Sequence, residues 1–251
     1  MVYVMSLKNL KNAIAQKNAL KVISGLNNFD LANVMAVCKA AELGGATFVD
    51  IAADQEIIKA VKESINLPVC VSAVEPQVFV NAVEAGADLI EIGNFDSFYA
   101  QGINFSAEDV LSLTRETRSL LPNVLLSVTV PHTLPLDEQV ELAQKLVTAG
   151  ADIIQTEGGT SSNPNHSGIL GLIEKASPTL AAAHAIARAV DVPVLCASGL
   201  SDVTVPMAIA AGASGVGVGS AINKLNDEVA MIAVVRSLTE ALNNSSVKTV
   251  I

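Results

Sequence analysis

The stretch 192-VPVLCASGLSDVTVPMAIAAGASGVGVGSAI-222 decides the fold. It begins with an apolar run that ends in the small residues Ser198 and Gly199, and continues through a short helical pattern and a Gly-Ala break. A second apolar run then ends at Gly219 and Ser220. Two apolar runs separated by a helical segment are typical of neighbouring parallel strands. Small residues at their ends would let backbone N–H groups approach an anion.

The second half of this stretch is one of four copies of a repeated pattern. Each copy has the end of a helix, then Gly-Ala, then an apolar strand without delay. The copies are 41–52, 82–93, 146–157 and 208–219. Strands of a second kind are predicted at 20–24, 67–72, 122–129 and 192–197. Eight apolar strands that alternate with helices predict a parallel (β/α)8 TIM barrel.

One barrel domain is therefore expected over residues 1–251, with an N-terminal helix at about 6–16 that caps the bottom of the core. The alternative is a doubly wound open sheet, which usually carries G-x-G-x-x-G after its first strand. The residues after the first predicted strand, 25-GLNN-28, do not supply that motif. The barrel is the preferred prediction.

Composition limits the class of protein. Hydrophobic residues make up 51% of the 251 residues, and the formal net charge is −10. This charge argues against a general nucleic-acid surface. No apolar run reaches a membrane-spanning length, and the start lacks a secretory signal pattern, so we expect a cytoplasmic protein without a membrane partner. Cys38, Cys70 and Cys196 lie in apolar patterns and are expected to be reduced core residues.

Aligning the four copies gives a register for polar residues inside the barrel. Asp50, Glu91, Gln155 and Gly217 share one position. Lys21, in the first strand, is expected beside them. Two interpretations stay open: a buried ion-pair network that fills the barrel, or a catalytic set with Lys21 as an amine or proton donor and Asp50 or Glu91 as its acid–base partner.

The loops add further candidates. Glu157 and His166, after the sixth strand, are predicted to be more solvent-accessible catalytic residues, and His132 follows the fifth strand near the mouth. His184 lies in an Ala-rich helix and is set aside. No two histidines have helical metal-ligand spacing, so no metal site is predicted. The loop after the fourth strand carries four aromatic residues that either anchor it, line a pocket or meet a second subunit: Phe95, Phe98, Tyr99 and Phe105.

The glycine-ended strands give the clearest site prediction. Ser198, Gly199, Gly217, Gly219 and Ser220 are expected to bind a phosphate group or the phosphate of a cofactor, because two adjacent strand ends are free of large side chains. This stretch resembles the paired phosphate-binding loops of the aldolase-class TIM-barrel superfamily. The resemblance implies phosphate-contacting amides at Gly199, Gly219 and Ser220.

The whole chain, from about residue 7 to 242, also resembles the conserved hypothetical chloroplast-frame family of cyanobacteria and plastids. The matching marks are 24-SGLNNFD-30, 48-FVDIAAD-54, 71-VSAVEP-76, 92-IGNFD-96 and 155-QTEGG-159. That family is a TIM barrel without an assigned reaction, and the resemblance places relatives in the plastid stroma. The segment 155-QTEGGT-160 with His166 also resembles the strand-six loop of nitronate-monooxygenase-like flavoenzymes, but the Pro-then-Met loop of that group is absent.

The sequence thus predicts an enzyme of isomerase, lyase or synthase type that acts on a small phosphorylated metabolite. An FMN-dependent oxidoreductase that uses the same phosphate site is one alternative, and a non-catalytic ligand-binding barrel is another. Whether the protein forms a homo-oligomer is left open.

Overall fold

The computed structural model describes residues 2–99, 101–158 and 162–246. Eight parallel strands pair in chain order, and β8 pairs with β1 to close the barrel. The strands are β1 (Ala19–Ile23), β2 (Phe48–Ala52), β3 (Val69–Ala73), β4 (Leu89–Ile92), β5 (Leu125–Thr129), β6 (Ile153–Gln155), β7 (Val194–Ala197) and β8 (Gly215–Val218). The predicted TIM barrel is confirmed.

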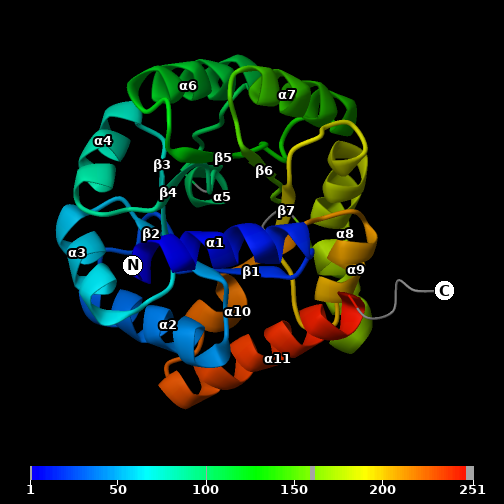
Figure 1. Ribbon diagram of the computed structural model, residues 1–251. Coiled ribbons are helices and arrows are strands. Elements are labelled where there is room, and N and C mark those ends of the chain that lie inside the picture. Colours follow the sequence, from blue (N-terminus) through cyan, green and yellow to red (C-terminus); the bar gives the residue numbers. More distant parts are fainter. Residues whose placement is uncertain (1, 100, 159–161, 247–251) are drawn as a thin grey trace.

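The helices are α1 (Val2–Ala15), α2 (Leu31–Gly44), α3 (Gln55–Ser64), α4 (Pro76–Glu84), α5 (Asp96–Tyr99), α6 (Ala107–Leu120), α7 (Leu136–Thr148), α8 (Gly168–Ala187), α9 (Val205–Ala210), α10 (Ser220–Asn223) and α11 (Glu228–Ser246). Most of them surround the strands in a ring, while α1 lies across the barrel (Figure 1). Asp30 caps α2, and Ser106 forms a capping box with Asp109 at α6. Both caps satisfy backbone N–H groups that have no partner within the helix.

Helix α1 crosses the end of the barrel at which the strands begin (Figure 1). Its Leu10 is fully buried in a cluster with Phe48, Cys70, Leu89, Ile153 and Leu195, which come from five strands. Leu7 and Ile14 pack against this cluster. The capping helix predicted at 6–16 is thus present, and it leaves the opposite end of the barrel free for a site.

The repeated Gly-Ala pattern has the same backbone conformation at the start of each strand that it precedes. Its glycine has a positive φ in every copy, between +85° at Gly45 and +113° at Gly212, a backbone conformation that favours glycine. In three copies the side chain two residues later accepts a hydrogen bond from a backbone N–H of the preceding strand. These pairs are Leu20 to Thr47, Val69 to Asp88 and Leu126 to Asp152. The repeat therefore sets the register of neighbouring strands.

Pro178 lies inside α8, which begins ten residues earlier at Gly168. Proline has no N–H to bond the carbonyl of Glu174 one turn back. Ser162 Oγ donates to that carbonyl instead, at 3.1 Å. The polar tail from Asn243 is helical as far as Ser246, and residues 247–251 lie outside the described part of the chain. Part of the predicted 155–159 motif, Gly159, lies outside the described residues.

Candidate functional site

A cavity of about 830 Å³ opens at the end of the barrel at which the strands finish. Its lining comes from the ends of β1, β4, β5, β6, β7 and β8 and from the loops that follow them. TIM-barrel enzymes keep their active sites at this end of the barrel. The cavity has two chemically different sides, one made of small residues and one made of carboxylate and hydroxyl groups.

The first side, here called the small-residue wall, consists of Ser198, Gly199, Gly219 and Ser220. Ser198 and Gly199 have positive φ values of +75° and +74°. A positive φ costs a non-glycine residue such as Ser198 about 1–3 kcal/mol, and residues in this conformation cluster at functional sites. Lys224 and Lys175 also line the cavity and bring positive charge to it. Four of the five residues predicted to bind phosphate therefore share one wall.

Gly217, the fifth predicted residue, has a different position. It is not among the described residues that line the cavity, and a Cβ at this position would lie 2.9 Å from the Cβ of Ala197. It would also lie 3.4 Å from Oε1 of Gln155, a buried atom without a hydrogen-bond partner among the described residues. Gly217 thus makes room for packing inside the barrel.

The predicted charged set forms a buried layer beneath the cavity. Lys21 Nζ lies 2.7 Å from Glu91 Oε2 and 3.2 Å from Asp50 Oδ2, and all three residues are 0% exposed. Ser127 donates to Glu91 and Ser72 donates to Asp50. None of the three charged residues is among the described residues that line the cavity. The sequence register is correct, and a catalytic role for this set stays a prediction.

Lys21, Asp50 and Glu91, here called the Lys21 layer, are hydrogen-bonded to two side-chain amides in the floor of the cavity. Gln155 Nε2 donates to Glu91 Oε1 at 2.7 Å, and Asn94 Nδ2 donates to Asp50 Oδ2 at 3.2 Å. Burial alone would lower the pKa of Lys21, but the carboxylates of Asp50 and Glu91 outweigh it and raise the pKa above its ordinary value. The amine therefore stays protonated, which is unsuited to nucleophilic attack.

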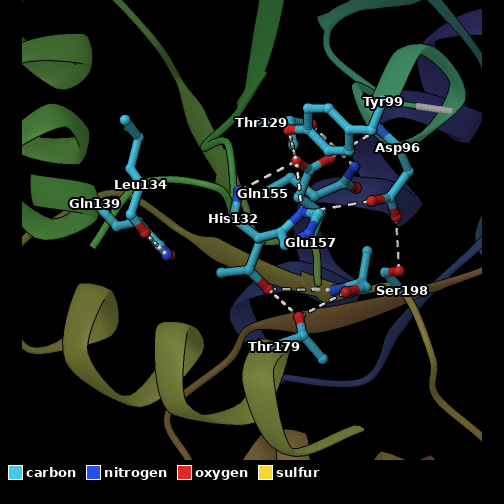
Figure 2. Close-up of polar contacts among 12 residues, drawn as sticks. Asp96, Tyr99, Thr129, His132, Leu134, Gln139, Gln155, Glu157, Thr179 and Ser198 are labelled. Atoms are coloured by element: carbon cyan, nitrogen blue, oxygen red, sulfur yellow. Dashed lines mark hydrogen bonds and ion pairs between the residues drawn. The ribbon is translucent and has the colours of Figure 1, made fainter. Parts of the chain in front are cut away.

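The second side of the cavity holds a polar cluster around Glu157 (Figure 2). Glu157 was expected to be solvent-accessible, but it is only 4% exposed. Its Oε1 accepts hydrogen bonds from the Tyr99 hydroxyl and from the backbone N–H of His132, and lies 3.1 Å from His132 Nδ1. The backbone N–H of Asp96 donates to Oε2 at 3.3 Å.

Asp96 connects the two sides. Its Oδ1 lies 3.4 Å from His132 Nδ1, and its Oδ2 accepts from Ser198 Oγ at 2.8 Å (Figure 2). Burial raises the pKa of Glu157, and the hydrogen bond from His132 opposes that shift. Burial by itself would lower the pKa of His132, but Glu157 and Asp96 raise it overall. We call Asp96, His132 and Glu157 the Glu157 cluster.

His166 is not brought to this cluster. Its Nδ1 lies 2.6 Å from Glu174 Oε1, and its side chain is 58% exposed. Glu174 also accepts from the backbone N–H groups of Asn165 and His166. This pair holds the loop in front of α8, so the structure gives His166 a local role, and its predicted contribution to catalysis stays untested.

The aromatic loop divides into two parts. Phe95 is fully buried, and the ring centroids of Phe95 and Phe98 lie 4.5 Å and 5.6 Å from that of Phe105. These three rings pack on one another and anchor the loop, and none of them is among the described residues that line the cavity. Tyr99 instead packs edge-on against His132 and bonds Glu157. The three cysteines are buried free thiols, as predicted.

A family model described as "Protein of unknown function (DUF561)" matches residues 5–248. The chain belongs to the DUF561 family. "Uncharacterized protein ycf23" of Cyanophora paradoxa is 47% identical over 243 residues, which cover 95% of this chain and 98% of that protein. The protein with the same name from Porphyra purpurea is 39% identical over 230 residues, covering 92% and 87% of the two chains. The predicted resemblance to the chloroplast-frame family is confirmed.

Solved structures share the fold of this DUF561 protein at low sequence identity. 3-Hexulose-6-phosphate synthase aligns with a TM-score of 0.63 and 17% identity over 89% of this chain and 99% of that one. Geranylgeranylglyceryl phosphate synthase from Thermoplasma acidophilum, in complex with its substrate sn-glycerol-1-phosphate, aligns with a TM-score of 0.61 and 14% identity, covering 95% and 98%. These likenesses establish the TIM-barrel fold and nothing finer.

Sequence reasoning missed the roles of two members of the candidate site. Asp96 was noted only as the last residue of the 92–96 family mark, and Tyr99 was one of four loop aromatics with three open interpretations. His132 was placed near the mouth but without partners. Among the residues described, no helix combines the length and apolar character needed to cross a bilayer.

Proposed function

We propose that this DUF561 protein is an enzyme that acts on a small phosphorylated metabolite, by isomerase, lyase or synthase chemistry. The observation that carries the proposal is the cavity itself, because the small-residue wall and the Glu157 cluster face one space. A phosphate on the wall would leave the rest of a small substrate within reach of the cluster.

The small-residue wall supports the binding half of the proposal. Glycine and serine leave backbone N–H groups accessible, and such groups bind phosphate without a charged side chain. Lys224 and Lys175 offset the negative field of a chain with net charge −10. The similar structures named above include one with a phosphorylated substrate bound, which makes the same ligand class a reasonable one here.

The Glu157 cluster supports the chemical half. Isomerase, lyase and synthase reactions of phosphorylated carbonyl compounds develop charge on a substrate oxygen, and an enzyme must stabilise that charge at a fixed, partly dry position. Glu157 and Asp96 line the cavity, and His132 is held between them. We assign the Lys21 layer a supporting role, since it fixes Gln155 and Asn94 in the floor.

A charge placed on the small-residue wall tests the binding half. Ser220 is exposed at the start of α10, so Ser220→Asp adds a negative charge without a packing conflict. Repulsion should weaken binding of sn-glycerol-1-phosphate or inorganic phosphate by about tenfold or more, as measured by isothermal titration calorimetry. Ser119→Asp adds the same charge on the exposed surface of α6 and should leave the affinity unchanged. Equal affinities in both variants would place the phosphate elsewhere.

A further inference from the structure

The Glu157 cluster has the spacing of metal ligands. One donor atom from each of Asp96, His132 and Glu157 lies within 4.8 Å of the other two. His132 Nδ1 is 3.1 Å from Glu157 Oε1 and 3.4 Å from Asp96 Oδ1. Around a cation with bonds of about 2.1 Å, neighbouring ligands lie about 3.0 Å apart in octahedral and about 3.4 Å apart in tetrahedral geometry. The two distances from His132 Nδ1 therefore match adjacent positions around one ion, and all three residues bring a donor atom within 4.8 Å of the others.

Both carboxylates of the cluster are oriented from outside it. Ser198 Oγ donates to Asp96 Oδ2, which leaves Oδ1 directed at His132. Tyr99 and two backbone N–H groups hold the Glu157 carboxylate. Metal sites commonly fix their ligands through such outer hydrogen bonds. The outer contacts come from the loops after β4, β5 and β7, so the barrel preorganises the cluster.

The cluster also has room for a substrate on one side. Asp96 and Glu157 line the cavity, together with Asn94 and Ser97, while His132 is only 9% exposed behind them. A cation held by three protein ligands would therefore have its remaining coordination positions toward the cavity. Catalytic metal sites, unlike structural ones, keep such an open position.

We infer that Asp96, His132 and Glu157 bind one divalent first-row metal ion, of the class of Mn²⁺ or Zn²⁺, at the side of the cavity. A mixed set of one imidazole and two carboxylates suits these ions better than Ca²⁺, which prefers oxygen ligands alone. Facing the cavity, the bound ion polarises a substrate oxygen and stabilises the charge that develops there.

To test the inference, the chelator-treated full-length protein is titrated with Mn²⁺ alone, and binding is measured by electron paramagnetic resonance. A second titration with Zn²⁺ alone is measured by calorimetry. One site per chain is expected. Asp96→Asn keeps an acceptor for Ser198 Oγ but removes the charge, and it should weaken Mn²⁺ binding at least tenfold. His132→Asn should do the same, and circular dichroism with thermal unfolding verifies that each variant is folded.

The His166–Glu174 pair provides a matched control. It has a His–carboxylate contact of 2.6 Å, but it is exposed and belongs to no three-ligand group among the described residues. Glu174→Gln should leave Mn²⁺ affinity unchanged. The inference is overturned if neither Mn²⁺ nor Zn²⁺ binds the wild-type protein at millimolar concentration, or if folded Asp96→Asn binds Mn²⁺ as tightly as wild type.

This inference can fail separately from the proposed function. The metal titration contains no phosphate ligand, and the phosphate titration of Ser220→Asp can be run in the presence of a chelator. If phosphate binds but no metal ion does, the metal site is rejected and the proposed function stands. If a metal ion binds but phosphate does not, the proposed substrate class is rejected and the metal site stands.

Discussion

Replacing Lys21 by methionine is expected to lower the free energy of unfolding by about 3–5 kcal/mol. The methionine side chain keeps much of the apolar stem of lysine but removes the charge. Two carboxylates, Asp50 and Glu91, then remain in the barrel interior at 0% exposure without their cation. An unpaired buried charge costs far more than a solvent-exposed one, because protein interior replaces water around it. Urea unfolding followed by circular dichroism measures the change.

A surface pair gives the scale for comparison. Lys145 lies 2.8 Å from Glu141 on α7, and both side chains are more than half exposed. Lys145→Met should change the free energy of unfolding by less than about 0.5 kcal/mol, since exposed ion pairs contribute little. If Lys21→Met costs no more than Lys145→Met, the buried layer does not hold the barrel together as described.

The second variant separates charge from packing. Lys21→Met combined with Glu91→Gln leaves one carboxylate, Asp50, which Ser72 and Asn94 still hydrogen-bond. About 1–2 kcal/mol of the loss should return, because neighbouring sites in one network are not additive. No recovery would mean that methionine fails through its shape.

These variants also decide between the two interpretations that the sequence left open for Lys21. If Lys21 is catalytic, its replacement should abolish the reaction with little change in the free energy of unfolding. If Lys21 is structural, its replacement should lower the free energy of unfolding. The contacts of Lys21 are all within the barrel, and the amides of Gln155 and Asn94 lie between this layer and the cavity. We therefore expect the stability effect.

The barrel was predictable from the sequence because its signals are local and repeated. Gly-Ala at 45–46, 86–87, 150–151 and 212–213 marks a helix end and a strand start within a few residues. These four Gly-Ala pairs indicate where the strands between them lie. They also predict that Asp50, Glu91 and Gln155 lie at the same height inside the barrel. Side chains alternate along a strand, so an aligned repeat predicts which residues share a face.

The Glu157 cluster was not predictable in the same way. Asp96, His132 and Glu157 follow three different strands. Only Glu157 lies inside a copy of the repeat, so aligning the copies does not bring the three residues together. Their meeting depends on the closure of the barrel and on the path of the loop that carries α5. Histidine spacing along one helix, the usual sequence sign of a metal site, cannot detect ligands from separate loops.

The burial of Glu157 shows the same limit. A glutamate in a long glycine-containing loop is typical of a solvent-accessible residue, and the sequence predicted one. Tyr99 and His132 cover it, and four hydrogen-bond donors on three residues stand in for water around the carboxylate. Such cover comes from neighbouring loops, which sequence patterns do not place relative to one another.

Gly93→Ala is expected to lower the free energy of unfolding by about 3 kcal/mol, the upper part of the range for overpacking. A Cβ at Gly93 would lie 2.1 Å from Thr129 Oγ1 and 2.5 Å from Thr129 Cβ, on the neighbouring strand end. Both atoms belong to a stiff β-branched side chain, so β4 and β5 would have to separate. Denaturant unfolding of the variant measures the cost.

The exchange of the two side chains tests this explanation. Gly93→Ala combined with Thr129→Gly removes the overlap and should recover part of the loss. The φ of +157° at Gly93 still strains an alanine, and a new glycine in a strand costs about 1 kcal/mol. Gly102→Ala, at a φ of +76° with no atom within 4 Å of its Cβ, should cost only about 1 kcal/mol of backbone strain. Equal losses for Gly93→Ala and Gly102→Ala would point to backbone conformation instead of overlap.

The position of Gly93 also links packing to the proposed metal site. Asn94, with a φ of +61°, and Asp96 follow it directly, so a displaced β4 end moves a floor residue and a proposed ligand together. Gly93→Ala should therefore weaken Mn²⁺ binding, and the Thr129→Gly exchange should restore it in parallel with stability. Restored stability without restored Mn²⁺ binding would show that Thr129 itself, through its contact with Gln155, is needed to shape the cavity.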